Sequence, residues 1–317
     1  MLLQLDPGDL RRQADRTPES SGYSHADYAA SFAGFGTPHR LEASNGWCLA
    51  RPVPGGGHRD LIGLYPFLCC EDYGALAEDF RCLKSGMVSL AAVPDPMQAL
   101  PTELEAVFDT VVPYKTHYIA DLEVPFSRYM TRHHRRYVGK ALAHITIEHA
   151  ARPVVHADEW ALLYSHLVTR RGIAGLRAFD PHSLGLQLAV PGCHYFRARR
   201  DDQTVGALVC YLDRGVAYAH LISTTPLGQT MLAQYALYWQ AIEYFRGHAR
   251  WFALGGTAGS EEPETGGLAF FKRGWATGSC VAYFCSKILD LETYENLVAR
   301  YGAAAGGFFP AYRHGGF

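Results

Sequence analysis

Short apolar segments with period-two alternation follow one another through the middle of the chain, and polar turns separate them. The clearest are Cys193–Arg199, Thr204–Leu212 and Val216–Ser223, joined by turns at Asp201-Asp202 and Asp213-Arg214-Gly215. Alternation of this length, bounded by turn residues, is typical of β-strands. The pattern therefore predicts a three-stranded antiparallel meander.

Segments with helical spacing of apolar residues lie between further segments of strand length. Helices are predicted at Asp72–Leu83, Phe126–Leu142, Asp158–Arg170 and from the N-cap Thr225 to about Phe245. Further strands are predicted at Arg40–Ala43, Trp47–Pro52, Leu61–Cys70, Met87–Val93, His144–His149, Trp251–Leu254 and Ser279–Ile288, with a crossing segment over Glu103–Val111 and Tyr114–Leu122. This alternation predicts an α/β fold with mixed sheets.

Length and composition add the number of domains and the kind of protein. A chain of 317 residues exceeds a typical single domain, and we expect an N-terminal domain at 1–118 and a C-terminal domain at 119–317. Hydrophobic residues make up 48% of the chain, enough for sizeable cores. The net charge of −2 gives no global attraction for nucleic acid, so such a contact would need a local basic patch.

The cysteines and the chain start predict the compartment. The eight cysteines show no CxxC pair and no metal-ligand spacing, so no metal site is expected. The N-terminal apolar run is far too short for a signal peptide, and no segment approaches the roughly 20 apolar residues of a membrane span. We expect a cytoplasmic protein with reduced thiols and no membrane span.

Several motifs of the second half occur in a recognisable order. A meander ending in His220-Leu221-Ile222-Ser223 precedes a helix through Tyr238–Ile242, a strand ending in Gly255-Gly256, and Gly267–Trp275 with its Phe271-Lys272 pair. This order resembles the GNAT superfamily, and more closely its FemAB-like branch, which has two tandem GNAT-type domains. The segments Asp121-Leu122 and Arg135–Ala141 are similar to the family's entry into its second domain.

The resemblance implies an acyltransferase that moves an acyl or aminoacyl group from an activated donor to an amine acceptor. The donor would be an aminoacyl-tRNA, an acyl-CoA or an acyl-carrier protein, used as a co-substrate, and no tightly bound cofactor is expected. The implied donor-binding residues are Ser223, Thr225, Gly228, Gly255, Gly256 and Phe271. The segment Thr225–Thr230 matches the acyl-CoA pattern of the superfamily only at the central Gly228.

Lys272 is the first candidate for catalysis. Its ammonium could stabilise the oxyanion of a tetrahedral acyl-transfer intermediate or hold a donor phosphate. The alternative is a surface lysine whose stem covers Phe270 or Phe271. The donor is expected between Val216–Ser223 and Trp251–Leu254, and the acceptor in the cleft between the domains near Lys272.

A general base is harder to identify, because Val216–Ser223 contains no carboxylate. Tyr218 and His220 share one face of this strand, and histidine has a suitable intrinsic pKa for proton transfer. We therefore name both as catalytic candidates. A buried, hydrogen-bonded histidine is the alternative for His220.

A basic stripe and a glycine-rich loop raise the question of phosphate binding, and only the stripe is a candidate for it. The stripe Arg128, Arg132, Arg135, Arg136 and Lys140 contains no acidic residue between its ends, so Arg132 and Arg136 are candidates for tRNA or donor phosphate contacts; a solvated helix face is the alternative. The adjacent His133 and His134 point in different directions, which argues against a shared metal. The loop Gly255–Ser260 runs into the acidic Glu261–Glu264, so it is expected to border the active site or to be a plain surface loop, not to bind phosphate.

A function from another class fits the same residues. The poor match at Thr225–Thr230 and the missing carboxylate would also suit a catalytically inactive GNAT-like fold used as a binding or scaffold protein. Loss of transfer activity on replacing Lys272 would separate the two.

Overall fold

The computed structural model of the protein describes residues 3–12, 21–83, 86–257, 266–302 and 308–313. Part of the predicted glycine-rich and acidic loop, residues 258–265, lies outside these ranges.

The elements of the first part of the chain combine short strands with short helices. They are β1 (Leu3–Gln4), α1 (Pro7–Arg12), α2 (Ala26–Ala30), β2 (Thr37–Leu41), β3 (Gly46–Pro52), β4 (Arg59–Gly63), α3 (Leu76–Cys82), β5 (Met87–Ala92), α4 (Pro101–Val107) and the long β6 (Thr110–Asp121). The hairpin predicted at Asn45-Gly46 joins β2 to β3, and Asn45 has the positive φ of 50° that this kind of turn requires.

The second part contains longer elements and the predicted meander. They are α5 (Phe126–Tyr129), α6 (Arg132–Leu142), β7 (Thr146–Ala150), α7 (Ala157–Arg171), α8 (Pro181–Ala189), β8 (Cys193–Arg200), β9 (Gln203–Asp213), β10 (Val216–Thr224), α9 (Pro226–Thr230), α10 (Ala233–Phe245), β11 (Trp251–Gly255), α11 (Gly267–Arg273), β12 (Gly278–Ile288) and α12 (Leu291–Tyr301). The meander β8–β9–β10 is antiparallel throughout, as predicted.

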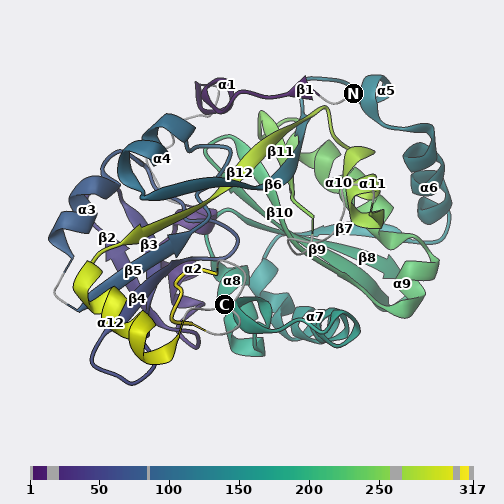
Figure 1. Cartoon of the computed structure of the whole chain (residues 1–317). Coiled ribbons are helices and arrows are strands. Elements are labelled where there is room, and N and C mark those ends of the chain that lie inside the picture. The colour runs from purple at the N-terminus through teal and green to yellow at the C-terminus, as the bar shows by residue number, and fades with distance from the viewer. Residues whose placement is uncertain (1–2, 13–20, 84–85, 258–265, 303–307, 314–317) are drawn as a thin grey trace.

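The described strands join into one twelve-stranded sheet in the order β2-β3-β4-β5-β12-β6-β11-β10-β9-β8-β7, with β1 paired to β12 (Figure 1). The pairs β4–β5, β10–β11 and β1–β12 are parallel and the other pairs are antiparallel. The predicted α/β fold with mixed sheets is confirmed.

The middle of the sheet links the two parts of the chain. The C-terminal strand β12 lies between β5 and β6, so the last strand of the chain completes the sheet of the first half. The predicted boundary at residues 118 and 119 falls inside β6, which pairs with both β12 and β11. The division into two domains stays a prediction.

Helices cover both faces of the second half of the sheet. On one face, a hydrophobic cluster joins α7 and α8 to inward residues of β10 and β11, among them Tyr218 and Ala253. On the opposite face, where α6, α10 and α11 lie (Figure 1), a second cluster joins these helices to the alternate residues Ala217 and Phe252. The period-two alternation of a strand explains why neighbouring residues serve different cores.

Several predicted elements differ from the structure in their limits. The helix predicted from Thr225 breaks at Leu232, whose φ of 60° is left-handed, into α9 and α10. The helix predicted at Phe126–Leu142 is likewise two helices, and Thr131 caps the second by accepting from the backbone N–H of His134. The strand predicted to Cys70 ends at Gly63, because the chain turns at Tyr65-Pro66. Helix α8 was not predicted.

Candidate functional site

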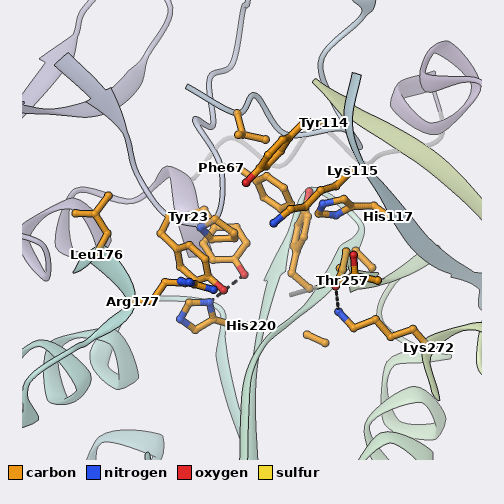
Figure 2. Close-up of a pocket in the computed structure, with 18 of the residues that line it drawn as sticks. Tyr23, Phe67, Tyr114, Lys115, His117, Leu176, Arg177, His220, Thr257 and Lys272 are labelled. Carbon is orange, nitrogen blue, oxygen red and sulfur yellow. Dashed lines mark hydrogen bonds between the residues drawn. The ribbon is translucent and has the colours of Figure 1, made fainter. Parts of the chain in front are cut away.

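A cavity of about 470 Å³ lies on the α7 side of the sheet, between residues of both halves of the chain (Figure 2). Aromatic rings form much of its wall, including Tyr65, Phe67 and Tyr114. Three cationic side chains line it, those of Lys115, Arg177 and Lys272, and no described carboxylate side chain does. The cavity is therefore an aromatic and positively charged site.

The cavity lies where β10 and β11 separate. Their parallel register ends at the pair Tyr218 and Ala253, while β10 continues to Thr224. Beyond this pair β10 has no described strand partner on its β11 side. We call this gap the split. It is the opening at which the donor was expected.

Two glycines hold the end of β11 against the neighbouring side chains. Gly255 has a φ of +76°, and a Cβ atom there would lie 3.2 Å from Lys272 Nζ. A Cβ atom on Gly256 would lie 2.9 Å from Nε2 of His117. The Gly-Gly pair therefore allows close approach to Lys272 on one side and His117 on the other.

Lys272 reaches the cavity from the opposite face of the sheet. Its helix α11 belongs to the cluster that contains Ala217 and Phe252, whereas the cavity lies on the face of Tyr218. The side chain is only 9% exposed, and its ammonium donates to the carbonyl of Gly256 (Figure 2). Lys272 is thus not a solvent-exposed surface lysine, and its charge lies beside the split.

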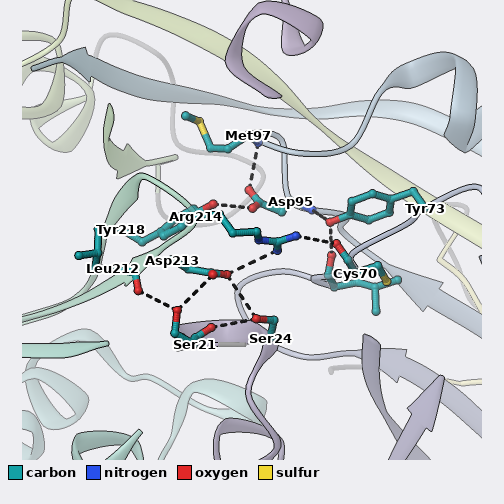
Figure 3. Close-up of polar contacts among 11 residues, drawn as sticks. Ser21, Ser24, Cys70, Tyr73, Asp95, Met97, Leu212, Asp213, Arg214 and Tyr218 are labelled. Atoms are coloured by element: carbon teal, nitrogen blue, oxygen red, sulfur yellow. Dashed lines mark hydrogen bonds and ion pairs between the residues drawn. The ribbon is translucent and has the colours of Figure 1, made fainter. Parts of the chain in front are cut away.

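Tyr218 lines the cavity and connects it to a buried carboxylate (Figure 3). Its hydroxyl donates to Oδ2 of Asp95 at 2.6 Å, and the backbone N–H of Met97 donates to Oδ1 of Asp95 at 3.0 Å. Asp95 is 1% exposed, and burial raises its pKa to about 6. Burial also raises the pKa of Tyr218 well above its ordinary value. At neutral pH the pair is a protonated phenol bonded to a carboxylate that is ready to accept a proton.

A buried ion pair between Arg214 and Asp213 influences the charge of the Tyr218–Asp95 pair. Arg214 lies 3.5 Å from the carboxylate of Asp213 and donates to the carbonyl of Cys70 at 3.3 Å (Figure 3). The hydroxyls of Ser21 and Ser24 donate to Asp213 at 3.2 and 3.3 Å. The positive charge of Arg214 lowers the pKa of Asp95 and so opposes the effect of burial, whereas the negative charge of Asp213 raises this pKa.

His220 lies in the cavity wall with both ring nitrogens occupied. Nδ1 is 3.1 Å from the hydroxyl of Tyr23 and Nε2 is 3.2 Å from Oε1 of Gln187. Since the amide oxygen can only accept, Nε2 carries the proton and Tyr23 donates to Nδ1. Burial lowers the pKa of His220 to about 3, so it is neutral at physiological pH. This geometry suits the buried, hydrogen-bonded alternative better than proton transfer.

Lys115 and His117 share one face of β6 and line the same cavity. Burial, together with the nearby charges of Lys272 and Lys115, lowers the pKa of His117 to about 3. The ammonium of Lys115 lies 4.6 Å from the ring centroid of Tyr114. Neither Lys115 nor Arg177 forms an ion pair with a described residue.

The structure brings five of the predicted site residues to the cavity and leaves six outside it. Lining the cavity are Tyr218, His220, Gly255, Gly256 and Lys272. Ser223 is 2% exposed and donates to the carbonyl of Leu163, away from the cavity. Phe271 packs on the opposite face of the sheet against Tyr235, Tyr238 and Trp275.

The start of α9, with the implied donor-binding residues Thr225 and Gly228, does not present the N–H of Gly228 to a phosphate. Thr225 accepts from the N–H of Gly228 at 3.1 Å, so this donor is already satisfied, and Pro226 has none. A Cβ atom on Gly228 would lie 2.0 Å from the carbonyl oxygen of Val205. Glycine is therefore needed at this position for packing against β9, a role that the resemblance did not imply.

The predicted basic stripe is exposed at Arg132 and Arg136, neither of which lines the cavity. We call Arg128 of α5 together with Arg132, Arg135, Arg136 and Lys140 of α6 the basic face. None of the five forms an ion pair with a described residue. A set of cations without carboxylate partners is suited to a polyanion.

Four residues in or beside the cavity were missed in the sequence. Asp95 stands in Pro94-Asp95-Pro96, a motif that by itself indicates only the end of a strand. Lys115 and His117 lie in the predicted crossing segment Tyr114–Leu122, and recognising this segment as a strand would have shown their shared face. Arg177 ends a short 3₁₀ helix (Gly175–Arg177) after α7, and no local pattern distinguishes it.

Solved structures with the same fold are found over most of the chain. FemX matches with a TM-score of 0.65 at 12% identity, covering 93% of this chain and 99% of FemX. The C-terminal DUF2156 domain of an Agrobacterium fabrum protein assigned as a lysylphosphatidylglycerol synthetase matches with a TM-score of 0.61 at 12% identity, covering 90% and 92%. L-PGS from Bacillus licheniformis matches with a TM-score of 0.55 at 11% identity, covering 89% and 98%.

These similarities confirm the FemAB-like GNAT fold. No protein-family model matches the sequence, and no curated protein matches it significantly. No described helix has the length and apolar character needed to cross a membrane.

Proposed function

We propose that the protein is an aminoacyltransferase that moves an aminoacyl group from an aminoacyl-tRNA to the amine of an anionic acceptor. The observation that carries this proposal is that the Lys272 ammonium at the split and Tyr218, whose hydroxyl is bonded to the buried Asp95, line one cavity. Acyl transfer needs a group that stabilises an oxyanion and a group that removes a proton from the amine. The cavity holds a candidate for each.

The acceptor amine attacks the carbonyl carbon of the donor ester, so a C–N bond forms and the carbonyl oxygen becomes an oxyanion. The ammonium of Lys272 stabilises this charge. Tyr218 takes a proton from the amine and passes its own to Asp95 across the 2.6 Å hydrogen bond. When the intermediate collapses, the ester C–O bond breaks and the leaving hydroxyl takes the proton back by the same route.

Two features favour a tRNA donor over acyl-CoA. The N–H of Gly228, which a pyrophosphate would need at the start of α9, is bonded to Thr225. Helix α6, which carries most of the basic face, lies on the same side of the sheet as α11, the helix from which Lys272 reaches the split. A tRNA bound along this face would present its aminoacyl end to the split from the side opposite the acceptor cavity.

The residues of the cavity wall support a negatively charged acceptor. Lys115 and Arg177 line it with no described carboxylate among the lining side chains, and their mutual repulsion is relieved when an anion binds. The aromatic wall suits a planar or apolar part of the same molecule. The name lysylphosphatidylglycerol joins an aminoacyl group to a phosphate-bearing acceptor, which agrees with the proposed negative charge, although phosphatidylglycerol accepts through a hydroxyl and not through an amine.

The test is a transfer assay with two donors. Radiolabelled aminoacyl-tRNA and labelled acetyl-CoA are each incubated with the protein and with paired amines that do or do not carry a phosphate. We expect label on the phosphate-bearing amine from aminoacyl-tRNA only. Transfer from acetyl-CoA alone would replace the donor, and saturable amine binding without transfer from any donor, including a charged acyl-carrier protein, would favour the inactive binding protein.

A further inference from the structure

His134 is a fully buried histidine of α6 that the transfer mechanism does not use. Its Nε2 lies 2.8 Å from the backbone carbonyl of Phe271, and its Nδ1 lies 2.7 Å from the hydroxyl of Thr131. Since the carbonyl can only accept, Nε2 is the donor and the Thr131 hydroxyl donates to Nδ1. Burial lowers the pKa of His134 to about 4, which keeps this neutral form.

The carbonyl of Phe271 lies at the end of α11, one residue before the lysine. In a continuing helix it would accept from the N–H of Trp275, but that N–H donates to the carbonyl of Lys272 at 3.1 Å. His134 supplies the donor that the helix end lacks. A side chain of α6 therefore caps the helix that carries Lys272.

Gly274 makes this contact sterically possible. A Cβ atom on Gly274 would lie 1.9 Å from Cε1 of His134, although its own φ of −67° would permit any residue. The ring also packs edge-on against Trp275, with centroids 5.0 Å apart at 88°. Space and hydrogen bonding thus fix the same ring against the end of α11.

Resting on the proposed function, we propose that His134 is a positioning residue for the transfer reaction: it holds the end of α11 so that the ammonium of Lys272 stays at the split. Helix α6 also carries most of the basic face, so the donor-docking surface and the oxyanion-stabilising charge are tied by one side chain. A shift of about 1 Å in such a group can cost about a hundredfold in rate.

The experiment combines a structural and a kinetic measurement on four variants. His134→Phe keeps a ring but removes both hydrogen bonds, and His134→Gln keeps an N–H near the position of Nε2. Gly274→Ala should force the His134 ring and α11 apart while leaving His134 itself unsubstituted. The matched control is Gly139→Ala on α6, where an added Cβ meets nothing within 4 Å.

The structural measurement is the rate at which an amine-reactive reagent labels Lys272, followed by peptide mass spectrometry. We expect labelling to be at least about tenfold faster in His134→Phe and Gly274→Ala, and near wild type in His134→Gln and Gly139→Ala. The kinetic expectation is a fall in kcat of about tenfold or more in the first two variants, with the acceptor KM within about twofold of wild type.

The two measurements separate failure of this inference from failure of the proposed function. Unchanged Lys272 labelling in a folded Gly274→Ala protein would overturn the positioning role. Faster labelling, in a protein that transfers from none of the tested donors, would show that His134 holds Lys272 in place and would remove the aminoacyltransferase. If His134→Phe does not fold, Gly274→Ala and His134→Gln carry the test by themselves.

Discussion

The split and the start of α9 both looked like donor sites in the sequence, and the structure makes them opposites. At the split, strand pairing ends early, a cavity opens, and the Lys272 ammonium lines it. At α9, the N–H of Gly228 is satisfied by Thr225 and the glycine itself packs against the carbonyl of Val205. A glycine therefore marks a ligand site only when its freedom leaves space and unsatisfied polar groups.

The largest effect is expected at the split. Lys272→Met keeps the apolar stem and removes the charge, so kcat should fall by about 10² to 10³ through loss of oxyanion stabilisation. The matched control is Lys287→Met, which removes a lysine of β12 that forms an ion pair with Asp109. Steady-state kinetics with saturating donor measure both, and a Lys272→Met enzyme with unchanged kcat would end the catalytic assignment.

The next effect concerns the proton path. Asp95→Asn retains an acceptor for Tyr218 but cannot take a proton, so we expect a loss of about 10² or more in kcat. Tyr218→Phe should lose about as much, and the double variant should lose little more, because the two act as one unit. Independent, additive losses would show that they do not share a path.

The pKa of Asp95 predicts how the kinetic constants of the wild-type enzyme depend on pH. Because burial raises that pKa to about 6, wild-type kcat/KM should fall as pH drops below about 6 and Asp95 takes up a proton. The raised native pKa also means that ionised Asp95 lowers the free energy of unfolding as pH rises from about 4 to 6. Asp95→Asn should therefore be no less stable than wild type at pH 8 despite its lower kcat, and thermal unfolding measures this stability.

A smaller, different effect is expected at the far wall of the cavity. Lys115→Met and Arg177→Met should raise the KM of an anionic acceptor by about tenfold each and leave kcat within about twofold, since charge–charge contacts bind the acceptor before and during transfer. The KM of a phosphate-free amine, measured in parallel, should not change. An equal effect on both amines would show that the cations do not recognise the acceptor's charge.

The basic face should affect donor binding in a salt-dependent way. Arg132→Ala and Arg136→Ala should each weaken tRNA binding and lower the slope of log K against log salt by about 1. Filter binding from about 50 to 200 mM salt measures this. If the variant that carries both substitutions keeps the wild-type slope, α6 has a solvated charged face that does not bind tRNA.

The smallest effect on activity is expected at α9. Thr225→Ala removes the cap on Gly228 and should lower the free energy of unfolding by about 1 kcal/mol. The donor KM should not change, because this helix start offers no open phosphate cradle. A rise in KM for acetyl-CoA in this variant would instead make α9 the donor site and reverse the comparison with the split.

The sequence by itself determined the class of fold and the order of its main elements. Hydrophobic periodicity is local, so the β8–β9–β10 meander, the α7 helix and the C-terminal end of α10 were predictable within a few residues. The Phe-Lys and Gly-Gly motifs, together with the family resemblance, identified Lys272 and the end of β11 as candidates. Breaks such as Leu232 were missed, since a left-handed residue there depends on packing and not on propensity.

Only the tertiary structure decided what these residues face. Asp95 and Tyr218 are separated by 123 positions, and no spacing along the chain predicts that they share a hydrogen bond. The insertion of β12 between β5 and β6 brings the end of the chain beside its first half, which local pattern does not encode. Strand register and helix placement depend on contacts distant in sequence. Those contacts place the buried carboxylate of Asp95 beside Tyr218, although the strand that carries Tyr218 contains no carboxylate of its own.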